Sequence, residues 1–259
     1  GVSNGTTFPS ADVVTAFVLT TALSAADEQA AMDVLASKWS ITNSPSTLLA
    51  VAGDSISSGY TGALFDCRNF SWFRSVAVSL GSRAVCFNTA MVGGWIGSLV
   101  SPYGPLANET AGTAAVQFGP QAPDTLDPLL DATKFTKQIL IVYGGHNDFA
   151  LFLAASAPAG YGATIWTTLQ TYCQARQAAG WTVIVVDCIP GTDITGQAET
   201  ERLSFNSLMA ANWATCASAF VQASALPWVG GDYIDGVHPN ATGQAMLAVV
   251  ILPKIQGLM

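Results

Sequence analysis

Four short apolar runs along the chain are typical of buried β-strands. They lie at residues 48–52, 84–87, 138–143 and 181–189. Each run is followed directly by glycine, asparagine or proline, and none keeps the strict alternation of a strand with one solvated face. Continuous apolar strands of this kind are typical of a parallel sheet that is covered by helices on both sides.

Stretches with apolar residues at helical spacing follow these runs. They lie at residues 70–80, 163–179, 199–214 and 240–258. Gly180 ends the second of them, and Pro239 suits the first turn of the last one, which Pro253 tightens or bends. The alternation predicts an α/β protein of three layers, with helices on both faces of a mostly parallel sheet.

Residues 1–44 do not follow this alternation. They contain a short strand-like run at 13–19 and a predicted helix at 25–38, with Ser24 as its N-cap. The part from 22 to 39 is similar to the closing helix of concanavalin-like or laminin-G-like modules, which indicates a linker or the remnant of a lectin-like module. The alternative is an ordinary N-terminal helix that packs on the core of the next domain.

Residues 101–123 are rich in proline, glycine and small polar residues, and they show no clear period. Long loops without secondary structure are uncommon unless they have a function. We therefore predict a flap that controls access to a crevice. The alternative is a solvent-exposed loop far from any site.

The composition excludes several classes of partner. A net charge of −8, a pI of about 4.4 and the absence of any Lys/Arg cluster argue against nucleic acids and anionic membrane surfaces. The best candidate for a membrane span, residues 245–252, ends at Pro253 and is far shorter than the roughly 20 residues required. Few charges and many small residues resemble extracellular bacterial enzymes, so we expect a secreted or extracellular protein. Nothing in the sequence indicates an oligomeric state.

The cysteines leave two structural possibilities open. An odd number allows at most two disulfides, and buried free thiols are the alternative. No Cys-x-x-Cys pair is present, which argues against a zinc site. The five residues are Cys67, Cys86, Cys173, Cys188 and Cys216.

A candidate nucleophile stands where the first apolar run ends. The run leads into Gly53-Asp54-Ser55, followed by small polar residues up to Gly59. A buried strand that delivers a serine into a turn before a helix has this pattern. Because a serine hydroxyl is a very weak acid, Ser55 needs a base, a group that orients the base, and donors for an oxyanion.

Other segments supply these groups. Asp235 stands three residues before His238, so in one bent segment its carboxylate can hold the Nδ1 proton and leave Nε2 as the base. Asn147 follows the third apolar run and is a candidate oxyanion donor. Gly93 and Gly94 follow the second run, and their N–H groups can approach an oxyanion because no Cβ blocks them.

These four blocks, in this order and spacing, resemble the SGNH or GDSL hydrolase superfamily. The blocks are Gly-Asp-Ser, a glycine after the second run, Gly-x-Asn-Asp and Asp-x-x-His, and the similarity covers residues 48–259. The resemblance implies a flavodoxin-like three-layer α/β/α sandwich with a mostly parallel five-stranded sheet. It also implies a catalytic domain at residues 45–259, after a separate segment at 1–44.

The resemblance assigns a role to each block as well. Gly93 fits the family's spacing better than Gly94, which leaves an ambiguity of one residue. The implied nucleophile is Ser55, the base His238 and its partner Asp235, and the implied oxyanion hole consists of the Ser55 N–H, the Gly93 N–H and the Asn147 side chain.

Four residues beside the blocks are candidate substrate contacts: Gly94, Trp95, His146 and Phe149. Trp95 and Phe149 can stack on a sugar ring or line an acyl pocket, and both are equally ordinary as core or rim aromatics. His146 is the sole rival of His238 as the base. It has no carboxylate three residues upstream, so we expect it to support the site and not to act as the base.

The block Gly-His-Asn-Asp resembles that of carbohydrate acetylesterases in this superfamily. The expected function is therefore that of a serine esterase which removes short acyl groups, above all acetyl, from carbohydrate hydroxyls. Its substrate would be a small-molecule or polysaccharide ester. The alternatives are a GDSL lipase or thioesterase for longer acyl chains, and a non-catalytic carbohydrate-binding module. No metal or other cofactor is expected.

Overall fold

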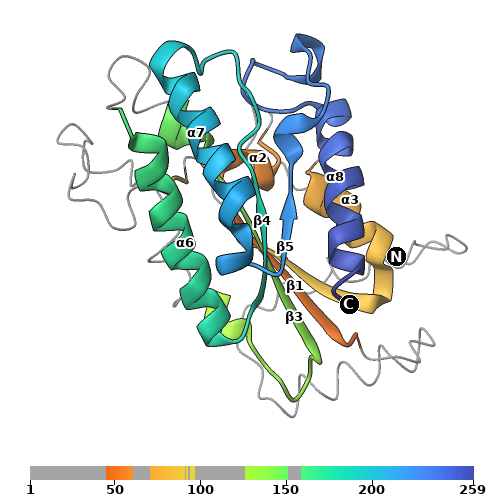
Figure 1. The fold of residues 1–259 in the computed structure, drawn as a ribbon. Coiled ribbons are helices and arrows are strands. Elements are labelled where there is room, and N and C mark those ends of the chain that lie inside the picture. The colour runs from red at the N-terminus through yellow and green to blue at the C-terminus, as the bar shows by residue number, and fades with distance from the viewer. Residues whose placement is uncertain (1–44, 61–70, 91, 93, 97–125, 151–158) are drawn as a thin grey trace, which may run out of the picture.

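The computed structural model describes residues 45–60, 71–90, 92, 94–96, 126–150 and 159–259 (Figure 1). The predicted helix at 25–38, the lectin-like remnant proposed for 1–44 and the predicted flap at 101–123 lie outside these residues. All three stay predictions.

Within the described residues, five strands form one sheet in the order β2-β1-β3-β4-β5. Every pairing between them is parallel. The sheet confirms the α/β fold expected from the sequence. Its strands are β1 (Thr47–Gly53), β2 (Ala84–Asn88), β3 (Lys137–Tyr143), β4 (Thr182–Val186) and β5 (Ala219–Val221).

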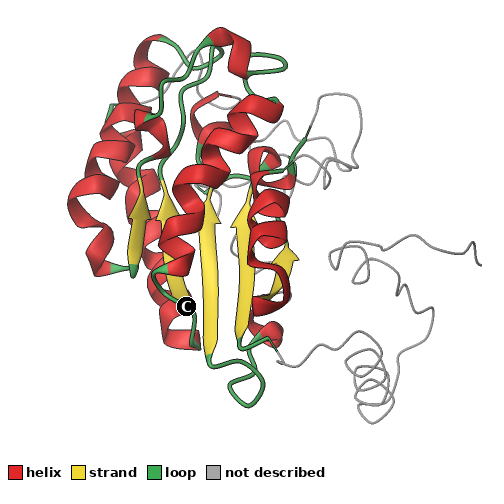
Figure 2. Ribbon diagram, turned by 90° about the vertical axis from the view of Figure 1, so that its right-hand side faces the viewer, coloured by secondary structure: helices red, strands yellow, loops and turns green. Residues whose placement is uncertain are grey.

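Helices cover both faces of the sheet (Figures 1 and 2). On one face lie α3 (Trp72–Leu80) and α8 (Ala241–Gln256), and on the other lie α6 (Tyr161–Ala179) and α7 (Gly196–Asn212). Two short helices, α2 (Ser55–Ser58) and α5 (His146–Ala150), follow β1 and β3 directly. Single turns of 3₁₀ helix lie at Gly81–Arg83, Asp127–Leu129, Trp213–Thr215, Ala223–Ala225 and Gly230–Asp232.

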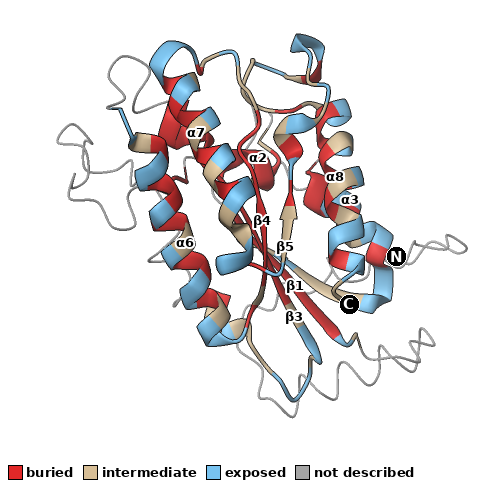
Figure 3. Ribbon diagram, in the orientation of Figure 1, coloured by how far each residue is buried: buried red, intermediate tan, exposed pale blue. Residues whose placement is uncertain are grey.

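Alternate residues of the central strands face two separate apolar cores. In β1, Leu49 and Val51 pack on the side of α3 and α8, whereas Leu48 and Ala50 pack on the side of α6 and α7. Every residue of β1 is buried, and Figure 3 shows the buried residues gathered between the sheet and its helices. Burial on both faces explains why the strands read as continuous apolar runs.

Two strands differ from the sequence-based expectation. None of the four apolar runs in the sequence corresponds to β5, which has only three residues. The fourth run was expected to extend to Ile189, but β4 ends at Val186. The Asp187 carboxylate accepts a hydrogen bond from Ser224 N at 2.8 Å. Asp187 N still donates to Val221 O of β5 at 3.1 Å, so the chain leaves the sheet only after the residue whose carboxylate binds the turn that follows β5.

The described residues bear on the cysteines, on membrane spans and on metal sites. Cys86, Cys173, Cys188 and Cys216 are free thiols, which favours the buried-thiol alternative, and Cys67 lies outside these ranges. No helix in the described part has the length and apolar character of a membrane span. The same residues contain no group of three or more His, Cys, Asp or Glu side chains that could hold a metal ion.

The turn between β1 and α2 is closed by Asp54. The Asp54 Oδ1 atom accepts a hydrogen bond from Ile56 N at 2.9 Å and thereby caps α2. A Cβ at Gly53 would lie 2.6 Å from Ser57 Cβ and 2.7 Å from Tyr143 O. Only glycine fits this tight connection from strand to helix.

Gln244 joins three helices behind this turn. Its side chain is buried in α8, where Oε1 accepts from Trp72 N at 2.8 Å and Nε2 donates to Ile56 O at 3.1 Å. The first backbone N–H of α3 and a carbonyl of α2 are thus satisfied by one amide. The start of α8 is thereby fixed to the turn that carries Ser55.

We expect Gln244→Ala to lower the free energy of unfolding by about 2–4 kcal/mol, because it leaves the buried Trp72 N–H without its partner and opens a cavity. Gln256 is exposed on the same helix. The Gln256→Ala control should change the free energy of unfolding by less than about 0.5 kcal/mol. Urea unfolding followed by tryptophan fluorescence measures both. Equal effects of the two substitutions would contradict the role of the buried amide.

We expect Asp54→Asn to remove a pH-dependent destabilisation. Burial raises the pKa of the Asp54 carboxyl from 3.8 to about 6, although His146 and the Ile56 N–H oppose this. Between pH 3.8 and about pH 6, Asp54 is protonated in the folded protein and ionised in the unfolded chain. Ionisation of Asp54 therefore destabilises the wild-type fold by about 3 kcal/mol as the pH rises through this window.

Asparagine also caps helices but does not titrate. The stability of the Asp54→Asn variant relative to wild type should therefore increase between about pH 4 and pH 6 and stay constant above that. Unfolding in urea at several pH values measures this difference. A difference that does not change with pH would contradict the prediction.

Candidate active site

Ser55, His238 and Asp235 form a chain of hydrogen bonds at the carboxyl edge of the sheet. His238 Nε2 lies 2.9 Å from Ser55 Oγ, although 183 positions separate the two residues. His238 Nδ1 lies 2.7 Å from Asp235 Oδ2. Because an ionised carboxylate only accepts hydrogen bonds, Nδ1 carries the proton and the Nε2 lone pair faces the serine hydroxyl. This arrangement allows the imidazole to take the hydroxyl proton.

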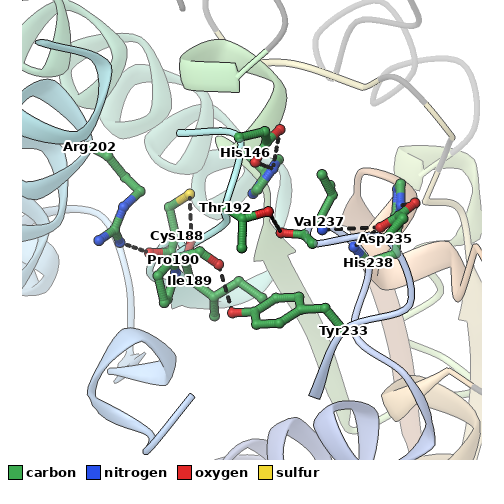
Figure 4. Close-up of polar contacts among 12 residues, drawn as sticks. His146, Cys188, Ile189, Pro190, Thr192, Arg202, Tyr233, Asp235, Val237 and His238 are labelled. Carbon is green, nitrogen blue, oxygen red and sulfur yellow. Dashed lines mark hydrogen bonds and ion pairs between the residues drawn. The ribbon is translucent and has the colours of Figure 1, made fainter. Parts of the chain in front are cut away.

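The loop that carries Asp235 and His238 (Figure 4) orients both side chains by itself. Asp235 Oδ1 accepts the N–H groups of Val237 at 3.0 Å and of His238 at 2.8 Å, which leaves Oδ2 for the imidazole. Partial burial opposes ionisation of Asp235, but the hydrogen bonds from His238 and Val237 outweigh it and hold the pKa of Asp235 below its ordinary value. Asp235 is therefore an ionised acceptor at neutral pH.

Asn147 lies at the carboxyl end of β3, next to the end of β1 that carries Ser55. The Asn147 Nδ2 atom donates to Gly94 O at 2.8 Å. An amide nitrogen has two N–H bonds, so one remains for an oxyanion. The Ser55 N–H belongs to the first turn of α2, where backbone N–H groups have no partner within the helix. Gly93 lies outside the described residues, so its role stays a prediction.

Two of the predicted substrate contacts have other partners. Phe149 is 0% exposed and packs against the rings of Tyr161 and Phe205, with centroids 6.3 and 5.6 Å away. The core alternative is therefore the correct one for Phe149. His146 is 2% exposed and its Nε2 faces Asp193 at 3.2 Å, so its role is internal to the protein.

Gly94 and Trp95 lie beside the site. The Gly94 carbonyl accepts the Asn147 amide, which makes Gly94 an orienting group for the proposed oxyanion donor. Trp95 is 5% exposed. The N–H of the next residue, Ile96, donates to Asp148 Oδ2 at 2.8 Å and ties this segment to α5. Contact of Trp95 with substrate stays a prediction.

Sequence reasoning missed two residues that contact the histidines. The Tyr60 ring meets the His238 imidazole edge to face, with centroids 4.7 Å apart and planes at 64°. Asp193 pairs with His146. The signal for Asp193 was present, because Asp193 follows soon after the fourth apolar run, and functional groups gather beyond the carboxyl ends of parallel strands.

The sequence also matches a known protein family. Residues 51–246 match the GDSL-like Lipase/Acylhydrolase family. This range includes Ser55, Asn147, Asp235 and His238. Comparison with curated proteins gives no match.

Three solved structures share the fold at low sequence identity. TesA is 18% identical, with a TM-score of 0.56 over 82% of this chain and 99% of that one. The native aryl esterase of M. smegmatis is 16% identical, with a TM-score of 0.60 over 82% and 100%. An active site mutant of a family two carbohydrate esterase from Clostridium thermocellum is 14% identical, with a TM-score of 0.57 over 84% and 66%. These likenesses show the fold alone. The family match spans most of the sequence, and the chain therefore belongs to the GDSL-like lipase/acylhydrolase family of SGNH hydrolases.

Proposed function

We propose that this protein is a serine esterase that removes short acyl groups, chiefly acetyl, from carbohydrate hydroxyls. Membership of the GDSL family assigns acyl ester hydrolysis to the chain. The observation that carries the proposal is the chain of hydrogen bonds from Asp235 through His238 to Ser55, with Asn147 at the neighbouring strand end. A nucleophile, a base, an orienting carboxylate and an oxyanion donor are the parts that acyl transfer needs.

In the proposed reaction, Ser55 Oγ attacks the acyl carbon while His238 Nε2 takes the hydroxyl proton. The carbonyl oxygen becomes an oxyanion, and the N–H groups of Ser55 and Gly93 and the Asn147 side chain are its proposed donors. Collapse breaks the bond to the alcohol, which receives the proton from His238. Water then attacks the acyl carbon while His238 takes a proton from it. Collapse breaks the bond to Ser55 Oγ, which receives that proton from His238, and the carboxylic acid is released.

Two observations support a carbohydrate as the alcohol. The block Gly-His-Asn-Asp at residues 145–148 resembles that of carbohydrate acetylesterases. One of the similar folds belongs to a family two carbohydrate esterase from Clostridium thermocellum. We also propose an extracellular location, which the composition supports.

A lipase or thioesterase that acts on longer acyl chains is the second candidate. The loop that carries the proposed base exposes 47% of Ile234 and places the half-buried Val237 next to His238. Apolar surface at this position suits a longer acyl chain. The third candidate, a non-catalytic carbohydrate-binding module, has no use for a serine that is hydrogen-bonded to a His–Asp pair.

We expect Ser55→Ala and His238→Ala each to lower kcat by about 10³-fold or more while the protein keeps its fold. Asp235→Asn should lower kcat by a similar factor, because its Oδ1 keeps the N–H groups of Val237 and His238 while its Nδ2 donates to His238 Nδ1 and leaves the imidazole proton on Nε2. Ser79 is exposed on α3, and the Ser79→Ala control should keep full activity. Hydrolysis of p-nitrophenyl acetate, circular dichroism and labelling with a fluorophosphonate probe measure these effects. An active Ser55→Ala variant, or labelling of that variant, would refute the assignment.

We expect kcat/KM to fall steeply when the acyl chain of p-nitrophenyl esters grows beyond acetyl, because the proposed site takes a short acyl group. The wild-type protein should also release acetate from an acetylated polysaccharide, and Ser55→Ala should not. A rise of kcat/KM towards the octanoyl ester, without acetate release, would favour the lipase or thioesterase instead.

A further inference from the structure

The connection between β4 and α7 lies between two parts of the site (Figure 4). We name residues 190–193 the bridging segment. The chain is fixed two residues before this segment, at Cys188, whose N–H donates to Asn206 Oδ1 at 3.0 Å. The Cys188 carbonyl accepts from Asn206 Nδ2 at 2.8 Å and from Arg202 Nη1 at 2.6 Å. Three hydrogen bonds to one buried residue give the segment a fixed starting point.

On one side the bridging segment holds the loop that carries the proposed base. Thr192 N donates to Gly236 O at 2.9 Å, and Tyr233 Oη donates to Pro190 O at 2.7 Å. Gly236 has a φ of 85°, and a Cβ there would lie 2.0 Å from Thr192 Oγ1. The two segments can approach this closely only because the side chain at 236 is missing.

On its other side the bridging segment holds α5. His146 Nε2 lies 3.2 Å from Asp193 Oδ1 and 3.3 Å from Oδ2. A Cβ at Gly191 would lie 2.4 Å from His146 Cε1 and 2.6 Å from Asp193 Oδ1. The His146 side chain is 3% exposed, so it has no solvent into which it could turn. The next residue along α5 is Asn147, the proposed oxyanion donor.

We propose that Asp193, acting through His146, is a positioning residue that holds the Asn147 amide in register with the Ser55–His238 pair. One rigid segment then sets the distance between the oxyanion donor and the base, although the two lie on different elements. Displacement of a catalytic group by about 1 Å costs on the order of 100-fold in rate. The inference rests on the proposed function, because it assumes that Asn147 acts on an oxyanion.

A pair of glycine variants tests the bridging segment. Gly191→Ala forces His146 away, so kcat for p-nitrophenyl acetate should fall about tenfold or more while KM changes less than about threefold. At Gly230 a Cβ would meet nothing within 4 Å. Neither glycine has a positive φ, so Gly230→Ala is a matched control with unchanged kcat. Equal kcat values for the two variants would overturn the proposal.

A double-mutant cycle tests the residue pair itself. Asp193→Ala and His146→Ala should each lower kcat about tenfold or more, and the double variant should lose no more than either single variant. In His146→Gln the side-chain N–H₂ stands where Nε2–H stood, so kcat should recover to within about threefold of wild type. Additive losses, or a His146→Gln variant as slow as His146→Ala, would mean that the pair only supports stability.

Nuclear magnetic resonance gives a readout that does not depend on activity. The chain has two histidines, so the ¹⁵N signals of both imidazoles can be assigned. In Ser55→Ala protein we expect the Nε2–H tautomer at His146, and Asp193→Ala should remove this preference. An unchanged tautomer would overturn the pairing. Wild-type protein that hydrolyses no ester would refute the proposed function, whereas an active wild type with an equally active Asp193→Ala variant would refute this inference alone.

Discussion

The hydrogen bond between Ser55 and His238 is the contact on which the site depends, because it joins the first strand of the sheet to the last helix. Ser55 opens α2, and His238 lies two residues before Asn240, the N-cap of α8. Gln244 binds the Ile56 carbonyl from the first turn of α8 and so fixes the two helix starts to each other. The position of the imidazole relative to the serine therefore follows from the packing of two helix N-termini at one edge of the sheet.

Close approach of backbone segments at this edge requires glycine at three places. A Cβ at Gly53, Gly191 or Gly236 would overlap side chains of neighbouring segments at 2.6 Å or less. At Gly53 the missing side chain permits the sharp turn into α2. At the other two positions it lets residues 190–193 contact α5 on one side and the loop before α8 on the other. The edge can thus hold separate segments within hydrogen-bond distance without an intervening layer of side chains.

The sequence predicted the elements whose signal is local. β1, β3 and β4 are buried on both faces, so their apolar runs stand out, and the residues that follow β1 and β3 could be named from the chain alone. β5 has three residues, too few for a period, and only one of them is fully buried. The contact of Asp193 with His146 escaped prediction because, unlike Asp235 and His238, the two residues do not belong to one short motif.

The packing of α5 decides between the alternatives that the sequence left open there. Sequence adjacency to Asn147 made both His146 and Phe149 candidates for substrate contact. Residues three apart lie on the same side of a helical turn, and both of these point into the protein: His146 towards Asp193, Phe149 towards the core. The side of a one-turn helix that faces the site depends on the packing of that turn, which no pattern within five residues can encode.

The two histidines of the chain show why similar residues take different roles. Each imidazole is paired with an aspartate, but through opposite nitrogens. His238 meets Asp235 through Nδ1, so its lone pair at Nε2 faces the Ser55 hydroxyl. His146 meets Asp193 through Nε2, and its Nδ1 is buried without a hydrogen-bond partner among the described residues. A base needs its free nitrogen within reach of the proton that it takes. The carboxylate that orients each ring therefore leaves a nitrogen lone pair beside the Ser55 hydroxyl at His238, the proposed base, whereas the proposed part of His146 is to hold α5.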